Sequence, residues 1–133
     1  MSTELYWMTL TVLMTALFWV PYLLDRCMVR GVWPAISDTK PEGGGPHSLW
    51  AQRAIRAHQN AVENLAIFVP AVLAAVALHI STPATRAAVV VYFFARLIHF
   101  LFYAAGVPVM RTLAFTAGWV AQIVILLSVL GWI

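Results

Sequence analysis

Residues 53–64 read Arg53-Ala-Ile-Arg56-Ala-His-Gln-Asn60-Ala-Val-Glu63-Asn64 and begin an otherwise apolar helix. Five of them are two cations, two amides and a carboxylate: Arg53, Arg56, Asn60, Asn64 and Glu63. At about 100° per residue, these five polar side chains share one helical face roughly 100° wide. Residues 65–80 are apolar apart from His79, so the helix is expected to enter a membrane. Its polar first half must then face protein or a water-filled pocket and not lipid.

Glu63 is the costly member of this polar face. An ionisable side chain at such a depth costs about 2.5–3.5 kcal/mol unless it is paired or solvated, so it marks a functional site by default. The alternative is a structural ion pair that fixes the helix bundle. On either interpretation Glu63 is expected to be the single buried carboxylate of the chain.

The composition indicates an integral membrane protein. Of the 133 residues, 62% are hydrophobic and only 10% are charged, and the mean hydropathy is +0.85. The net charge of +3 is spread over the helix ends without a basic run, which argues against a nucleic-acid partner. The single cysteine, Cys27, excludes an internal disulfide, and no Cys/His spacing predicts a metal site.

The chain is predicted to be one domain, residues 1–133, that folds as an all-α bundle of four membrane-spanning helices. The expected helices cover about residues 5–30, 48–80, 84–104 and 108–132. Pro21 and Pro70 should bend the first two. Met1-Ser-Thr-Glu4 lacks the basic start of a signal peptide, so the first helix is expected to be retained. Residues 31–49, with glycines at 43–45, are expected to form a flexible polar connection and not a phosphate-binding loop.

The basic residues predict the orientation in the membrane. With four spans, the connection after the first helix lies on the same side as the joint between the third and fourth helices. That side carries Arg26, Arg30, Lys40, Arg53, Arg56, Arg96 and Arg111, and the other side carries Arg86. Both termini are therefore predicted to lie outside the cytoplasm, with the polar pocket near the cytoplasmic surface.

The third helix carries a second polar stripe. Its members lie within about 60° of one another and are Tyr92, Arg96, His99 and Tyr103. Because Arg96 would otherwise face lipid, this stripe is expected to face the polar face of the second helix, with Arg96 near enough in depth to pair with Glu63. The alternatives are ordinary packing for the tyrosines and a hydrogen-bonded core position for His99. Arg111 adds a cation at the same end, and His79 and Cys27 are interpreted as structural.

The residue types disfavour several catalytic classes. No serine has a histidine and a carboxylate in a recognisable arrangement, and one buried carboxylate does not support a paired-carboxylate mechanism. The predicted pocket is mainly cationic. Arginines that converge with one carboxylate, two amides and tyrosine hydroxyls suit a small ligand with several anionic groups and one ammonium group.

Two motifs and one further cation resemble a known family. They are Arg56-Ala-x-x-Asn60-x-x-Glu63 followed by Pro70, then Phe94-Ala-Arg96-Leu-x-His99-Phe-x-x-Tyr103-Ala, and Arg111. Together they resemble bacterial-type members of the membrane-associated proteins in eicosanoid and glutathione metabolism (MAPEG). The order of the motifs, the length and the four-helix plan agree over essentially the whole chain.

The resemblance implies a homotrimer in a bacterial inner membrane, with glutathione as cosubstrate between neighbouring subunits. Glutathione would be held by Arg53, Arg56, Asn60, Glu63, Arg96, His99 and Tyr103. Glu63 would meet its amino end and the arginines its carboxylates, while Arg111 would stabilise the thiolate, with Arg26 or Arg30 as the alternative. The implied activity is a glutathione transferase or peroxidase that acts on lipophilic electrophiles or hydroperoxides from the lipid phase, without a metal.

Two other functions compete with this one. The first is a non-catalytic trimer of the same fold that binds lipids or a partner. The second is a small transporter or channel subunit, which is disfavoured because one short polar stripe gives neither an internal repeat nor a polar path through the membrane. The complete set of Arg56, Asn60, Glu63 and Arg111 favours the enzyme, because a scaffold alone would not need it.

Overall fold

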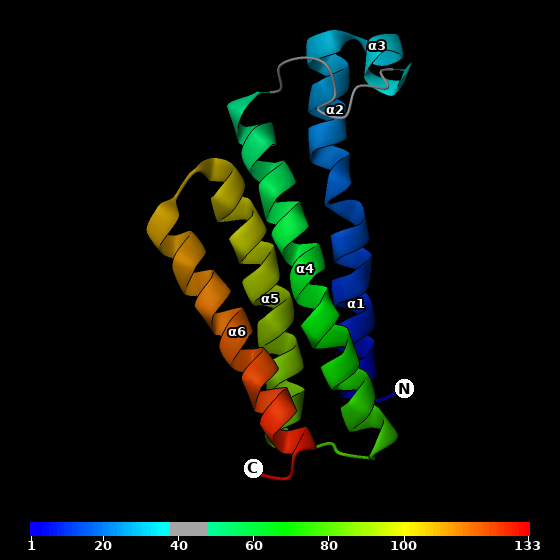
Figure 1. The fold of residues 1–133 in the computed structure, drawn as a ribbon, viewed down its shortest axis with the longest axis vertical. Helices are drawn as coiled ribbons and strands as arrows, with labels where there is room; N and C mark the ends of the chain where they lie inside the picture. Colours follow the sequence, from blue (N-terminus) through cyan, green and yellow to red (C-terminus); the bar gives the residue numbers. More distant parts are fainter. Residues whose placement is uncertain (38–47) are drawn as a thin grey trace.

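A computed structural model describes residues 1–37 and 48–133, and all regular structure in these ranges is helical. The helices are α1 (Thr3–Leu17), α2 (Trp19–Arg30), α3 (Val32–Ser37), α4 (Leu49–Ala77), α5 (Pro83–Ala105) and α6 (Pro108–Val129) (Figure 1). Four candidate spans are long and apolar enough to cross a membrane: Thr3–Arg30, Leu49–Ala77, Pro83–Ala105 and Pro108–Val129. Lys40 and the glycines at 43–45 lie outside the described residues.

The first span is divided into α1 and α2, which meet at Phe18. Pro21 has no N–H to donate to the carbonyl of Leu17, so the regular hydrogen bonding of α1 ends there. Residues 31–49 were predicted to form a flexible connection, but residues 32–37 are helical. Gly31, with a φ of 87°, ends α2, and the short helix α3 follows at once.

The other helix ends follow local sequence signals. Ser48 precedes α4, and its backbone N–H donates to Asp25 Oδ2 of α2 at 3.0 Å. Thr82 and Thr85 form a reciprocal capping box at the start of α5, with Pro83 in the first turn. Gly106 ends α5 in the left-handed conformation, which allows the tight joint to α6.

The bundle is built around α4 and α5, which pack against each other. α1 also packs against both of these helices, and so does α6. Alanines 54, 57 and 61 on α4 are buried and allow close approach of the neighbouring helices. Beside these alanines Phe18, between α1 and α2, stacks on Phe100 of α5, with ring centroids 4.0 Å apart. The described helices therefore form a four-span bundle in which α1 and α6 lie on opposite sides of the α4–α5 pair.

Glu4 is a buried carboxylate that the sequence analysis did not identify. Only 2% of its surface is exposed, at the end of the bundle where α1 begins and α5 begins. Its Oε1 accepts hydrogen bonds from Ser81 Oγ at 2.9 Å and Thr85 Oγ1 at 2.8 Å. Asp25 is buried as well, so the expectation of a single buried carboxylate is wrong.

Replacing Glu4 should destabilise the bundle. Glu4→Ala removes the carboxylate that accepts from the buried Thr85 hydroxyl and from the Ser81 hydroxyl, and the loss of hydrogen bonds to a carboxylate typically costs about 1.5–3 kcal/mol. Thermal unfolding in detergent should show a clear fall in Tm. The matched control is Thr9→Ala on the same helix, because Thr9 is exposed and bonds only its own helix through the Leu5 carbonyl. Equal Tm values for the two variants would contradict this role of Glu4.

Candidate functional site

Two adjoining cavities lie near the α5–α6 joint, between the first turns of α4 and α6. The first has a volume of ≈ 250 Å³ and is lined by Leu49, Gln52, Arg53, Arg56, Tyr103 and Arg111. The second has a volume of ≈ 270 Å³ and is lined by His99, Tyr103, Arg111, Thr112 and Phe115. Because Tyr103 and Arg111 line both, we treat the two cavities as one site and call it the crevice.

Arg53 is held by the end of α5. Its Nε donates to the carbonyl of Ala104 at 2.9 Å, so it satisfies a backbone acceptor that the helix end leaves open. Gly106 makes this approach possible, because a Cβ at that position would lie 3.1 Å from Arg53 Cζ. Arg53 therefore joins α4 to α5 and lines the crevice at the same time.

Arg111 lies against an aromatic side chain at the boundary of the two cavities. Its Cζ is 4.6 Å from the centroid of the Tyr103 ring, which is a cation–π contact. The Tyr103 ring in turn meets His99 edge to face, with centroids 5.6 Å apart. These contacts fix a cation and two aromatic side chains at the place where a ligand would enter.

Arg96 lies deeper in the bundle and is almost fully buried, with 2% of its surface exposed. Its Nη2 donates to Asn60 Oδ1 at 2.6 Å, and no hydrogen bond or ion pair joins it to Glu63. The expected pairing of Arg96 with Glu63 is therefore not formed. Asn60 lies on the side of α4 that meets Arg96, whereas Glu63 is exposed on the protomer surface. An amide oxygen takes the place of the expected carboxylate.

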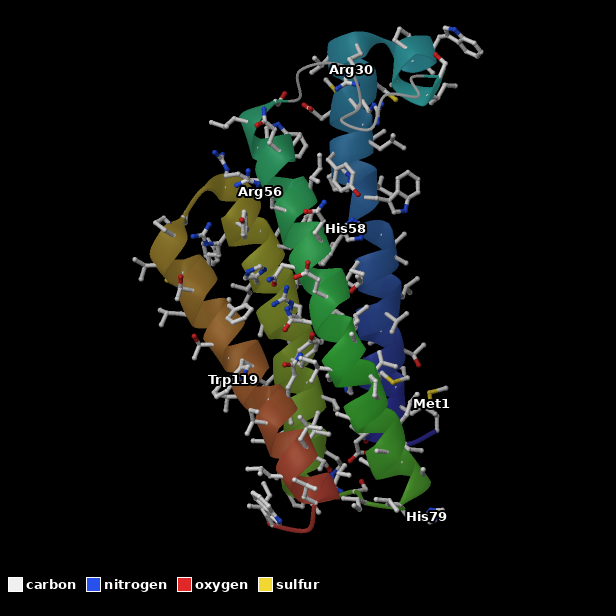
Figure 2. All side chains as sticks on the ribbon, viewed as in Figure 1. Met1, Arg30, Arg56, His58, His79 and Trp119 are labelled. Carbon is white, nitrogen blue, oxygen red and sulfur yellow. The ribbon has the colours of Figure 1, made fainter. Side chains whose placement is uncertain are left out.

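The side chains of Arg56 and His58 point away from α4 in different directions. Figure 2 shows Arg56 toward α5 and α6, and His58 toward α1 and α2. The Nδ1 atom of His58 is 2.8 Å from the Tyr22 hydroxyl, so His58 belongs to the packing of the first span. Arg56 and Glu63 are both exposed in the protomer. Charged side chains in a membrane span face protein or water, and the part of the chain that the structure describes does not cover these two.

The crevice is cationic. Three arginines, Arg53, Arg56 and Arg111, line it, and within residues 1–37 and 48–133 no acidic residue does. Two buried nitrogen atoms beside it, Arg96 Nε and His99 Nδ1, have no hydrogen-bond partner in the described part of the chain. Unpaired donors and uncompensated cations in a low-dielectric setting favour an anionic ligand with further acceptor atoms.

A hydrogen-bonded network below the crevice was not predicted from the sequence. Asn64 Nδ2 donates to the carbonyl of Asn60 at 2.9 Å and to its Oδ1 at 3.3 Å. Gln122 Nε2 donates to the carbonyl of Asn64 at 3.2 Å and to the Tyr92 hydroxyl at 3.3 Å. The signal that could have identified Gln122 is an amide in an apolar segment, on the same helical face as Arg111. Thr112 was also missed as a lining residue.

The structure thus gathers most of the predicted residues at one place. Arg53, Arg56, His99, Tyr103 and Arg111 line the crevice directly, and Arg96 and Asn60 form the hydrogen-bonded pair beneath it. Glu63 does not line either cavity of the protomer, and neither do Arg26 and Arg30 at the end of α2.

Comparison with known proteins gives one match. A family model described as the MAPEG family matches residues 5–131. No curated protein and no solved structure matches the chain.

The contact between Gly106 and Arg53 can be tested by substitution. Gly106→Ala should lower the Tm for two reasons. Alanine is strained at the φ of 78° that this position has, and its methyl group would lie against the Arg53 guanidinium. The conformational cost alone is about 1–2 kcal/mol. Gly131→Ala is the control, since Gly131 has a φ of 76° and nothing within 4 Å of an added Cβ. The effect of Gly106→Ala should shrink in an Arg53→Ala background; an undiminished effect would contradict the contact.

Proposed function

We propose, because the chain belongs to the MAPEG family, that it is a membrane-bound, glutathione-dependent transferase or peroxidase of lipophilic electrophiles or hydroperoxides. Family membership supports a membrane protein of the glutathione-related transferase and peroxidase type. The observation that carries the proposal further is the crevice itself, where Arg53, Arg56 and Arg111 converge and none of the described acidic residues is among the lining residues. A tripeptide with two carboxylates would supply the missing negative charge.

Each part of glutathione has a suitable partner. The two carboxylates suit Arg53 and Arg56 at the outer cavity, where guanidinium groups bind carboxylates with paired hydrogen bonds. The ammonium group suits Glu63, the carboxylate of the exposed face of α4. The thiol would then lie near Arg111, at the boundary between the two cavities.

The proposed chemistry uses the cation at Arg111. A positive charge beside the sulfur favours the thiolate over the thiol, and the released proton passes to water. The thiolate then attacks the electrophilic carbon of a substrate, forming a C–S bond while the leaving group departs with its electron pair. With a hydroperoxide, the thiolate sulfur attacks one oxygen of the O–O bond, which breaks to give a sulfenic acid and an alkoxide that takes a proton from water. A second glutathione thiol then attacks the sulfenic sulfur, forming the disulfide and releasing water. The protein contributes orientation and charge, and forms no covalent bond.

The proposed assembly is a homotrimer in a bacterial inner membrane. The exposed Arg56 and Glu63 on a membrane-spanning helix support assembly, because a neighbouring subunit would cover a face that lipid cannot solvate. The end of the bundle that holds the crevice carries Arg26, Arg30, Arg53, Arg56 and Arg111, whereas Arg86 lies at the other end. This asymmetry supports a cytoplasmic crevice and termini on the opposite side.

The alternative is a trimer of the same fold that binds lipids or a partner without catalysis. In that case the crevice would hold an anionic ligand without activating a thiol. The two functions differ in one measurable property, which is the ionisation state of bound glutathione.

Glu63→Gln should weaken glutathione binding while the oligomer persists, because the amide keeps the shape and loses the charge that meets the ammonium group. Truncating one partner of a buried charge pair typically costs about 2–5 kcal/mol. Calorimetric titration measures the change. Glu4→Gln is the control, since it removes a carboxylate at the opposite end of the bundle and should leave the affinity unchanged. An unchanged Kd for Glu63→Gln in an intact oligomer would make Glu63 a structural residue.

Arg111→Ala should raise the pKa of the bound thiol. In the wild type that pKa should lie well below the value of about 8.5 for a free cysteine thiol. Ultraviolet absorbance of the thiolate against pH gives both values, and turnover with an activated aryl halide should fall in parallel.

A sulfur-free glutathione analogue provides the control for Arg111→Ala, because its affinity should change little. An identical titration in wild type and variant would point to Arg26 or Arg30 as the thiolate partner. Bound glutathione without a thiolate signal at any pH would support the non-catalytic alternative.

A further inference from the structure

Three layers of contact join α4, α5 and α6 at successive depths. The layer nearest the α5–α6 joint is the crevice, and two hydrogen-bonded layers lie beneath it. Each layer has one member from α4, one from α5 and one from α6. The first layer consists of Arg53, Tyr103 and Arg111, and the second of Asn60, Arg96 and Gly118. The third layer consists of Asn64, Tyr92 and Gln122. The third layer is the one in which a side chain of α6 hydrogen-bonds to both other helices.

Gln122 makes these bonds from a fully enclosed position, with 1% of its surface exposed. Its Nε2 donates to the Asn64 carbonyl of α4 and to the Tyr92 hydroxyl of α5. The Tyr92 ring is itself fixed by stacking on Phe68, with centroids 3.8 Å apart. Lipid cannot replace these hydrogen bonds, so a shift of α6 would leave the amide unsatisfied. Gln122 therefore holds α6 at one height and one rotation relative to α4.

The height of α6 determines where Arg111 lies. Arg111 and Gln122 are eleven residues apart, which corresponds to about 16 Å along the helix and to nearly the same helical face. The first turns of α6 pack on the end of α5, and between them and α4 lies the crevice. Beneath Arg111, the hydrogen bond from Gln122 to the Asn64 carbonyl therefore joins α6 to α4.

The same network determines which end of the Asn60 amide is accessible. Arg96 can only donate hydrogen bonds, so the Asn60 atom 2.6 Å from its Nη2 must be the oxygen. Asn64 Nδ2 donates to that oxygen as well. Asn60 Nδ2 makes no hydrogen bond to the described part of the chain and is not among the buried unsatisfied atoms. It remains as an accessible donor, which would contact a carbonyl or carboxylate of a ligand.

We propose that Gln122 is a positioning residue for the crevice. Its hydrogen bond to the main-chain carbonyl of Asn64 joins α6 to α4 one turn from Asn60, the residue with the accessible donor. Through α6 it fixes the distance of Arg111 from the arginines of α4. The effect on ligand affinity rests on the proposed function, whereas the effect on the shape of the crevice does not.

The test compares Gln122→Met, which keeps the length of the side chain and loses its hydrogen bonds, with Ser128→Ala. Ser128 is a matched control because it is buried on the same helix and bonds only the Val124 carbonyl of that helix. Calorimetry gives the affinity for glutathione. A reporter cysteine, Thr112→Cys in a Cys27→Ser background, gives the shape of the crevice through its rate of alkylation by an anionic maleimide.

Gln122→Met should weaken glutathione binding by about tenfold, the scale expected for loss of buried hydrogen bonds, and should change the alkylation rate severalfold. Ser128→Ala should change neither. A folded Gln122→Met with unchanged affinity and alkylation overturns the proposal, whatever its Tm. A wild type that binds no glutathione, combined with altered alkylation in Gln122→Met, overturns the proposed function and supports the positioning role.

If Gln122→Met does not assemble, a second variant tests the proposal. Tyr92→Phe removes one of the two acceptors of Gln122 and keeps the ring stacked on Phe68. It should move both readouts in the same direction by a smaller factor. If both stay at the wild-type values, the proposal is overturned.

Discussion

The rest of the site depends on one interaction, the hydrogen bond between the Arg96 guanidinium and the Asn60 amide. This guanidinium is buried between membrane-spanning helices, and no described carboxylate pairs with it. Arg96 meets the amide oxygen of Asn60, which satisfies one hydrogen bond and leaves the positive charge uncompensated. Desolvating such a charge costs several kcal/mol unless polar groups or an opposite charge are supplied. The bundle supplies amides beneath it and leaves space above it, where Arg111 and the arginines of α4 add further positive charge. This excess of positive charge supports the proposed binding of an anion.

The membrane explains why the polar groups occur in layers. In hydrocarbon, a buried polar side chain must find its partner within the protein, and a partner on a neighbouring helix also fixes helix register. Gln122 does this below Arg96 through the Asn64 carbonyl and the Tyr92 hydroxyl, and Glu4 does it at the opposite end of the bundle through Ser81 and Thr85. Arg56 and Glu63 remain exposed in the described bundle, which supports the proposed assembly.

Much of the fold follows from the sequence, because a long apolar run has few alternatives in a membrane. The four spans were predicted by the length of the apolar segments, and the shared face of Tyr92, Arg96, His99 and Tyr103 by helical periodicity. Periodicity gives the direction of a side chain and leaves its partner undetermined, so it could not tell whether Arg96 meets Asn60 or Glu63, which lie on neighbouring parts of one face. Glu4 was overlooked because its partners are hydroxyl groups about eighty residues away. Gln122 is one amide in an apolar run, and its role depends on two helices that the local sequence does not specify.

The central claim is that the uncompensated arginines bind the carboxylates of a thiol peptide. The most direct test is calorimetric titration of the purified, detergent-solubilised protein with glutathione and, separately, with its diester, in which both carboxylates are masked. The account predicts saturable binding of glutathione and a large loss of affinity for the diester. Equal affinity for the two ligands, or no saturable binding of glutathione, would contradict it.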